Sequence, residues 1–209
     1  MDLPEPPLLV ISDRGQARRP LIAIAEAAFA GGCRWFSLRE KDLPAAERHR
    51  LLAALVELGH RFGATVTAHQ DIEAVVAVGA DGVHLPANGD PHAARGVLPR
   101  ALIGASAHST TEAAARLRAG ADYVTLSPVF LTVSKPGYGP AIGLVGLARV
   151  AAAVDGPVLA LGGVDWENAG RCLAAGAAAV AVMGEVMRAD DPQATVAELI
   201  ASVSPRRTG

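Results

Sequence analysis

The sequence has two cysteines, few aromatic residues and no long uncharged apolar run. The cysteines, Cys33 and Cys172, form no CxxC pair, so we interpret them as small buried hydrophobic residues and not as a redox or metal site. No uncharged apolar run approaches the roughly 20 residues that cross a bilayer. We therefore expect a cytoplasmic protein with no membrane partner.

The sequence also lacks an excess of either positive or negative charge. The 19 Lys and Arg residues nearly balance the 21 Asp and Glu residues, and no basic block or basic stripe interleaved with aromatics is present. Nucleic acid is therefore not an expected partner. Hydrophobic residues make up 51% of the chain and charged residues 19%, which excludes a wholly disordered protein. Because aromatics are only 4%, the core must be built mostly from Ala, Val, Leu and Ile.

The length of 209 residues favours one domain over residues 1–209, ordered from about 8 to 203 with short terminal tails. Short β-branched runs alternate with Ala- and Leu-rich segments of helical period, which predicts repeated βα units and a parallel sheet. Strands are predicted at 8–13, 35–40, 64–69, 82–86, 102–108, 123–129, 157–163 and 179–184. Helices are predicted at 20–31, 44–62, 71–78, 90–97, 110–119, 143–154, 165–175 and 192–203. Eight strands close a barrel, so the expected fold class is α/β, a (β/α)8 TIM barrel, with an open doubly wound sheet as the alternative.

Polar residues gather where the predicted strands end. Ligands of both candidate folds bind at the carboxyl ends of the strands, so these residues are the candidates for a functional site. They are Arg39 and Lys41 after the second strand, His69 after the third, His84 in the fourth, Ser106 and His108 at the end of the fifth, and the segment 132–140 after the sixth.

Two glycine turns follow the seventh and eighth strands, at Gly162-Gly163 and at Gly184. Without a Cβ atom, such turns let backbone N–H groups approach a phosphate at a helix N-terminus, where the helix dipole also favours negative charge. Barrels often bind phosphate after strands seven and eight. The turns therefore predict a phosphate site, and a tight βα turn without a ligand is the alternative.

Alternating charges, Arg39-Glu40-Lys41-Asp42, follow the second strand. A period of two points Arg39 and Lys41 the same way, which suits a second anion, whereas a solvated loop of mutually paired charges is the alternative. The glycine- and proline-rich segment 132–140 has the composition of an active-site loop that covers a ligand.

Three histidines are candidates for the site. His84 stands between two apolar strand residues, so it faces opposite to them, towards the barrel interior or its mouth. A hydrogen-bonded core histidine and a ligand contact both remain open for it. His69 and His108 lie at strand ends and favour the site.

Five blocks in one register, at 38–42, 79–85, 104–108, 127–136 and 160–164, resemble the thiamine phosphate synthase family and its close relatives, the thiazole tautomerases. The resemblance implies a transferase of thiamine biosynthesis that joins hydroxymethylpyrimidine diphosphate to a thiazole phosphate and releases pyrophosphate. It implies phosphorylated small molecules as partners. A homodimer stays open.

The resemblance also implies roles for individual residues. Arg39 and Lys41 would hold the diphosphate, and Ser106 and Lys135 would contact the departing pyrophosphate; these four are the catalytic candidates. Thr132 and Ser134, with the amides near Gly163 and Gly184, would hold the thiazole phosphate. The full set of substrate-binding candidates is Ser37, His69, His84, His108, Thr132, Ser134, Gly162, Gly163, Met183 and Gly184.

Mg²⁺ is the cofactor that the resemblance implies, yet the two positions that carry metal-binding aspartates in the synthases are Gln70 and Gly89 here. Asp71 and Asp90 lie one residue later and become metal candidates if both loops bulge, because side-chain direction reverses at each strand residue. A thiazole tautomerase-like isomerase and a non-catalytic phosphate-ligand binding barrel are the alternative functions. The histidine of the tautomerases is replaced by Pro128.

Overall fold

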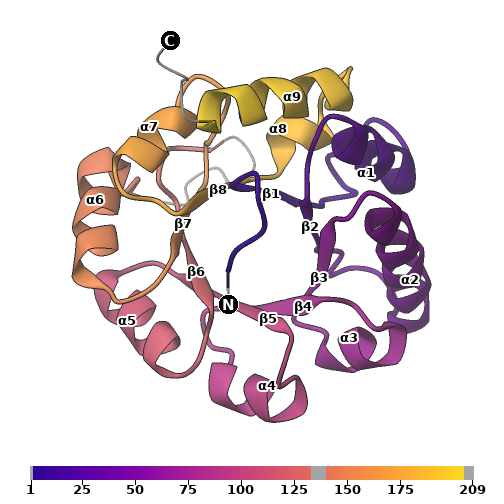
Figure 1. Ribbon diagram of the computed structural model, residues 1–209, viewed down its shortest axis with the longest axis horizontal. Coiled ribbons are helices and arrows are strands. Elements are labelled where there is room, and N and C mark those ends of the chain that lie inside the picture. Colours follow the sequence, from indigo (N-terminus) through magenta and orange to yellow (C-terminus); the bar gives the residue numbers. More distant parts are fainter. Residues whose placement is uncertain (1, 133–139, 205–209) are drawn as a thin grey trace.

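The structure of the protein is a computed structural model that describes residues 2–132 and 140–204. Eight parallel strands follow one another around a closed barrel, each paired with its sequence neighbours and the last with the first (Figure 1). This confirms the predicted (β/α)8 barrel and excludes the open sheet. The strands are β1 (Leu8–Ile11), β2 (Trp35–Leu38), β3 (Thr65–His69), β4 (Gly82–Leu85), β5 (Leu102–Ala107), β6 (Tyr123–Leu126), β7 (Val158–Leu161) and β8 (Ala179–Val182).

Helices form an outer ring around the strands (Figure 1). They are α1 (Leu21–Ala30), α2 (Ala45–Arg61), α3 (Ile72–Val78), α4 (Pro91–Val97), α5 (Thr110–Arg118), α6 (Gly143–Ala153), α7 (Ala169–Ala174), α8 (Gly184–Met187) and α9 (Pro192–Val203). Helix α8 was not predicted, because four residues are too few to show a helical period. Within the described residues, no helix is both long and apolar enough to cross a membrane.

Polar caps start several of the helices directly after a strand. The Asp71 carboxylate accepts a hydrogen bond from the backbone N–H of Ala74 at 2.9 Å, and Ser109 Oγ accepts one from Glu112 N at 3.2 Å. Each cap satisfies an N–H group that has no partner inside its helix. Short strand-to-helix connections of this kind keep the loops at the carboxyl end of the barrel compact.

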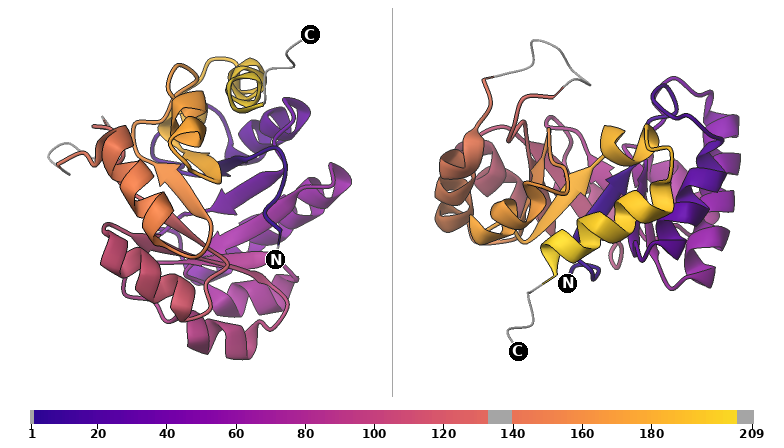
Figure 2. Two further views of the ribbon diagram at one scale, coloured as in Figure 1. Left: turned by 60° about the vertical axis from the view of Figure 1, so that its left-hand side comes forward. Right: turned by 90° about the horizontal axis from the view of Figure 1, so that it is seen from above.

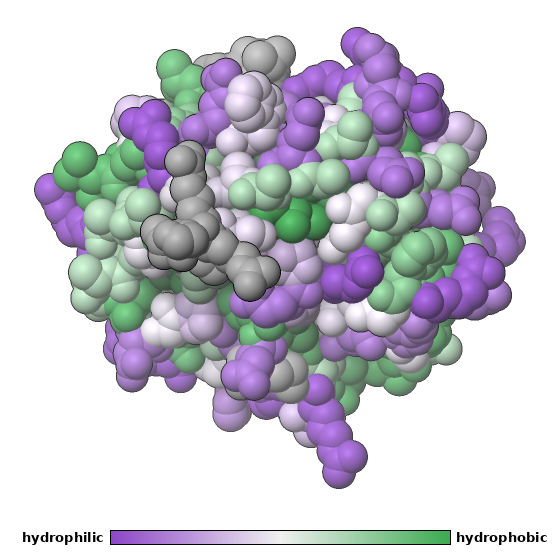
Figure 3. Space-filling model, turned by 45° about the horizontal axis from the view of Figure 1, so that its top comes forward, coloured by the Kyte–Doolittle hydropathy of each residue, from purple (hydrophilic) through white to green (hydrophobic). Residues whose placement is uncertain are grey.

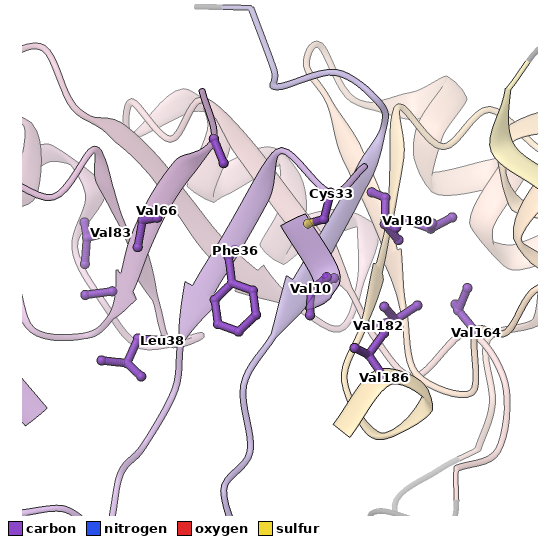
Figure 4. Packing of buried hydrophobic residues seen from close by; sticks show 14 of the residues in the cluster. Val10, Cys33, Phe36, Leu38, Val66, Val83, Val164, Val180, Val182 and Val186 are labelled. Atoms are coloured by element: carbon purple, nitrogen blue, oxygen red, sulfur yellow. The ribbon is translucent and has the colours of Figure 1, made fainter. Parts of the chain in front are cut away.

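Most of the core lies between the strands and the helices. Figure 4 shows a row of these side chains on neighbouring strands, from Val83 and Val66 through Phe36 and Val10 to Val180. Their strand register places Phe36 beside Val66 and Val10. Aliphatic residues dominate this layer, as the low aromatic content requires.

A second, smaller cluster fills the inside of the barrel. The Trp35 and Tyr123 rings meet edge to face there, with centroids 4.9 Å apart. Leu3 packs against this cluster, and Figure 2 places the start of the chain at the end of the barrel opposite to that towards which the strand arrows point. The amino end of the barrel is therefore covered by the N-terminal segment, and the carboxyl end faces the candidate site.

Gly104 on β5 makes the room for Tyr123. A Cβ atom at this position would overlap the Tyr123 ring, so we expect Gly104→Ala to lower the free energy of unfolding by about 1–3 kcal/mol through overpacking. Urea denaturation measures the loss. Gly96→Ala is the matched control: nothing lies within 4 Å of its new Cβ, and alanine favours the helix, so stability should rise by up to about 1 kcal/mol. Equal stability of the two variants would contradict the assignment.

The barrel interior is polar on one side and apolar on the other. The residues Ser37, Thr67, His84 and Thr125, on strands β2, β3, β4 and β6, are buried, whereas β7, β8 and β1 contribute Leu, Ile and Ala side chains. Among the described residues, the buried hydroxyls of Ser37 and Thr67 have no hydrogen-bond partner. A bound molecule therefore meets hydrogen-bonding groups mainly along the β2–β6 side.

Large exposed hydrophobic residues are scattered over different elements and loops. They are Val76, Val97, Leu131, Val145 and Trp166. On the face drawn in Figure 3, hydrophobic residues form small groups among hydrophilic ones. Scattered single apolar residues do not mark an interface, so the homodimer stays a prediction.

Candidate active site

A cavity of about 280 Å³ lies at the carboxyl ends of β6, β7 and β8. Both glycine turns line it: Gly162 and Gly163 follow β7, and Gly184 begins α8. Met183 and Thr132 line it as well. The structure thus brings together five of the predicted substrate-binding residues around one space. Ser134 and Lys135 lie outside the described residues.

The glycine turn after β7 is held in place by a side-chain hydrogen bond from the segment that precedes α7. Gly162 and Gly163 have φ values of 96° and 63°, a left-handed conformation that favours glycine. The Asn168 side-chain amide donates to the Gly163 carbonyl at 3.0 Å. In a trans peptide the N–H of Val164 points opposite to that carbonyl, and Val164 lines the cavity. Asn168 therefore fixes the orientation of one backbone donor at the cavity wall.

The glycines are also required by packing. A Cβ on Gly163 would come within 2.5 Å of the Leu131 carbonyl oxygen, and one on Gly162 within 2.9 Å of Pro128 Cα. The segment after β6 therefore lies against the turn after β7. A bulky substitution at Gly163 would disturb both segments, so it cannot isolate a phosphate contact. The tight turn and the phosphate site are compatible interpretations of the same glycines.

Three charged residues of this cavity were missed by the sequence analysis: Asp165, Glu185 and Arg188. Burial and the neighbouring Asp165 carboxylate raise the pKa of Glu185, and Arg188 acts in the opposite direction. Arg188 donates a hydrogen bond to Gln16 Oε1, although 172 positions separate the two residues. No local sequence pattern connects them, and Arg188 directly follows the unpredicted helix α8.

A second cavity, of about 270 Å³, lies at the ends of β2 and β3. Lys41 and His69, both predicted, line it together with Arg48 of α2, which was not predicted, and Gln70. Arg39 directly follows β2 and is half-buried. The carboxylates of Glu40 and Asp71 also line it, and Arg48 is paired with Asp71 at 2.6 Å. The positive charge available to an anion here is therefore that of the segment after β2, which carries Arg39 and Lys41.

Glu40 differs from a solvated loop residue because it is buried, with 3% exposure. Its carboxylate accepts a hydrogen bond from Ser12 Oγ at 2.7 Å and from the Arg14 backbone N–H at 3.0 Å. Burial raises the pKa of Glu40. Ser12 Oγ also accepts the backbone N–H of Arg39 at 2.8 Å. Ser12 and Glu40, both missed as functional residues, therefore fix the backbone that carries Arg39 and Lys41.

His84 belongs to a buried hydrogen-bond network at the barrel centre. Its Nε2 lies 3.1 Å from Ser106 Oγ, its Nδ1 lies 3.2 Å from the Tyr123 hydroxyl, and its ring stacks on His69 with centroids 5.5 Å apart. Burial lowers the pKa of His84 to about 4, so the ring is neutral at pH 7. His84 is thus a satisfied core histidine that also contacts a predicted catalytic residue.

His108 and Ser37 take different places around the opening. His108 is exposed, and its Nδ1 lies 2.8 Å from the Ser127 carbonyl oxygen at the end of β6. Ser37 is buried inside the barrel, opposite Thr67 in the strand register. Neither residue lines the two cavities, so their contact with a substrate stays a prediction.

The two metal candidates are helix caps. Asp71 caps α3, and its carboxylate accepts a hydrogen bond from Arg48 Nε at 2.7 Å. Burial alone would raise the pKa of Asp71, but the Ala74 N–H and Arg48 hold it below its usual range. Asp90 caps α4 and accepts the N–H groups of His92 and Ala93.

The carboxylates near the two cavities are not arranged to bind a magnesium ion. Among the residues that the structure describes, no group of three His, Cys, Asp or Glu side chains is placed to hold a metal. The nearby carboxylates of Glu40 and Asp71 already accept hydrogen bonds from backbone and side-chain donors. An aspartate at Gly89 would be crowded, because its Cβ would lie 2.8 Å from Leu85 Cβ.

Comparisons with known proteins show the family of this chain. The family described as thiamine monophosphate synthase matches residues 8–186. A putative thiamine-phosphate synthase of Geobacter sulfurreducens is 43% identical over 202 residues, which cover 95% of this chain and 95% of the relative. A thiamine-phosphate synthase of Roseiflexus castenholzii is 39% identical and covers 91% of this chain and 85% of the relative.

Among solved structures, a thiamine phosphate pyrophosphorylase from Pyrococcus furiosus superposes with a TM-score of 0.85 at 32% identity, covering 94% of each chain. The agreement spans nearly the whole barrel. The chain therefore belongs to the thiamine monophosphate synthase family.

Proposed function

We propose that this protein is a transferase that joins hydroxymethylpyrimidine diphosphate to a thiazole phosphate and releases pyrophosphate. The observation that carries the proposal is the presence of two cavities suited to anions at one barrel mouth, one after β7 and β8 and one after β2 and β3. The reaction needs two phosphorylated substrates, and each cavity suits one of them. Family membership supports the same reaction.

In this proposal the thiazole phosphate binds in the glycine-lined cavity. Gly163, Gly184 and Thr132 line this cavity. The backbone amides at the two glycines would donate to the phosphate, with the hydroxyls of Thr132 and Ser134 in the role that the family resemblance implies. The pyrimidine diphosphate binds beside Arg39 and Lys41, with Ser106 and Lys135 on the departing pyrophosphate. Both reacting partners are thereby held at the open end of one rigid barrel, which favours reaction by proximity.

The chemical step breaks the C–O bond between the pyrimidine methylene and the diphosphate. The bonding electrons leave with pyrophosphate, and the thiazole ring nitrogen supplies the pair for the new C–N bond. Negative charge grows on the leaving group, so positive side chains stabilise the transition state more than the bound substrate. His84 holds the Ser106 hydroxyl at 3.1 Å and thereby orients it.

Mg²⁺, when bound in this family, would neutralise part of the diphosphate charge. The carboxylates here do not fit that ion, so the positive charge that stabilises the leaving pyrophosphate comes from Arg39, Lys41 and Lys135 in this proposal. We therefore expect a weak dependence of activity on Mg²⁺.

Restoring one carboxylate tests this expectation. Gln70 lines the second cavity with a φ of 67°, a conformation that aspartate and asparagine tolerate. Gln70→Asp should lower the Mg²⁺ concentration for half-maximal activity, whereas Gln70→Asn, which adds no charge, should leave it unchanged. A magnesium titration of initial rates measures both. An identical response of the two variants would show that position 70 does not contact the ion.

A thiazole tautomerase-like isomerase is the second candidate function. The observation that favours it is His108, whose Nδ1 contacts the Ser127 carbonyl next to Pro128, the position of the tautomerase histidine. A coupling assay separates the candidates: incubation with both substrates should give thiamine phosphate and pyrophosphate in equal amounts. Conversion of a thiazole phosphate tautomer without coupling would support the isomerase, and binding without either reaction would support a non-catalytic barrel.

A further inference from the structure

The glycine-lined cavity contains two carboxylates beside the backbone amides. Asp165 and Glu185 both line it and both are half-buried, and burial together with the Asp165 charge raises the pKa of Glu185. A phosphate dianion in this cavity meets two groups of its own sign. Amide donors carry only partial charges, so an anion site here needs a full positive charge nearby.

Arg188 is in the position to provide that charge. Of the described residues that line the cavity, it is the one with a positively charged side chain. Its guanidinium lies directly over Gly184: a Cβ built on Gly184 would overlap the guanidinium group. The absence of a side chain at the start of α8 therefore leaves the space in which Arg188 reaches the cavity.

Gln16, from the segment between β1 and α1, fixes the direction of this arginine. Gln16 Oε1 accepts a hydrogen bond from Arg188 Nη1, and Gln16 Nε2 donates to Asp13 Oδ2 at 2.6 Å. Gln16 Nε2 also lies 3.7 Å from the sulfur of Met183, which lines the cavity. The hydrogen bonds that link Asp13, Gln16 and Arg188 thus limit the rotamers of an otherwise exposed arginine. They keep its charge at the rim of the glycine-lined cavity.

We propose that Arg188 binds the phosphate monoester in the glycine-lined cavity and that Gln16 is its positioning residue. The proposal deepens the proposed function, on which it rests for the identity of the phosphate-bearing substrate. An arginine fork can make two parallel hydrogen bonds to phosphate oxygens, and it offsets the Asp165 and Glu185 charges. Arg188 therefore selects for a phosphorylated ligand over the corresponding alcohol.

Titration calorimetry with inorganic phosphate tests the arginine without any need for turnover. Arg188→Gln should raise the dissociation constant about 10- to 100-fold, the range for losing a hydrogen bond to a charged group. Arg188→Lys keeps the positive charge but loses the two parallel donors of the guanidinium. Its dissociation constant for phosphate should lie between those of wild type and Arg188→Gln. Arg18→Gln is the matched control, because Arg18 pairs with Asp190 next to α8 but does not line the cavity. Equal phosphate affinity in wild type and Arg188→Gln would overturn the proposal.

Steady-state kinetics and a double-mutant cycle test Gln16. Gln16→Leu should raise KM for the thiazole phosphate several-fold with little change in kcat, because it weakens ground-state and transition-state binding alike. In an Arg188→Gln background the same substitution should have almost no further effect, since Gln16 acts through Arg188. Independent, additive effects of the two substitutions would contradict the positioning role.

The inference and the proposed function can fail separately. Weak phosphate binding by Arg188→Gln with no coupling activity in any preparation would support the arginine site and reject the transferase. Coupling by wild type with an unchanged KM for the thiazole phosphate in Arg188→Gln would support the transferase and reject the arginine site.

Discussion

Arg39→Ala and Lys41→Ala should each lower kcat about 10²–10³-fold, the usual cost of losing one group that stabilises charge formed in the transition state. Both residues follow β2 on a backbone that Ser12 and Glu40 hold in place, and Lys41 lines the second cavity. Each substitution removes a positive charge from a leaving group whose negative charge grows as the C–O bond breaks. Initial rates at saturating concentrations of both substrates measure the effect.

The control for these variants is Arg50→Ala. Arg50 is an exposed residue of α2 that does not line either cavity at the barrel mouth, so its loss should leave kcat unchanged. If kcat of Arg39→Ala and Lys41→Ala matched that of Arg50→Ala, the diphosphate would have to bind elsewhere. An increase in KM alone would mean that the two residues bind substrate without stabilising the transition state.

The second large effect is a loss of stability in acid that depends on His84. Burial lowers the pKa of His84 from 6.5 to about 4, so the folded protein resists protonation of a ring that the unfolded chain protonates readily. The unfolded state binds more protons between these two values, and the contribution of His84 is therefore complete above pH 6.5 and lost as the pH falls to about 4. The free energy of unfolding should fall by about 3 kcal/mol over this pH range because of His84.

Urea denaturation at several pH values measures this contribution as a difference between proteins. His84→Gln should be less stable than wild type at pH 7, because Ser106 and Tyr123 lose a buried partner, and its stability should fall less steeply below pH 6.5. His92→Gln is the matched control, since His92 is exposed. If the free energy of unfolding fell as steeply with pH in His84→Gln as in His92→Gln, the assignment to His84 would be wrong.

The barrel could be predicted from the sequence because its signals are local. Alternating apolar strands and helical segments specify eight βα units, and the parallel arrangement places their polar ends at one rim. Lys41, His69 and the two glycine turns were expected at this rim from their places after the strands, and the structure divides them between two cavities. The side of the sheet on which the His84 side chain lies was also predictable, since its neighbours in β4 are apolar.

Contacts between distant segments could not be predicted. Ser12 meets Glu40 across 28 positions, and Arg188 meets Gln16 across 172. No pattern within one segment specifies such pairs, because they depend on the closure of the barrel. The capping role of Asp90 is visible in the sequence, since an aspartate followed by proline, here Pro91, is a common helix start.

A crystal structure of the protein with pyrophosphate and a thiazole phosphate bound would test the central claim, that two separate cavities hold the two phosphorylated groups. We expect the thiazole phosphate beside Gly163, Gly184 and Arg188, and the pyrophosphate beside Arg39 and Lys41. Both phosphates in one cavity, or either of them away from the carboxyl end of the barrel, would contradict the proposed reaction geometry.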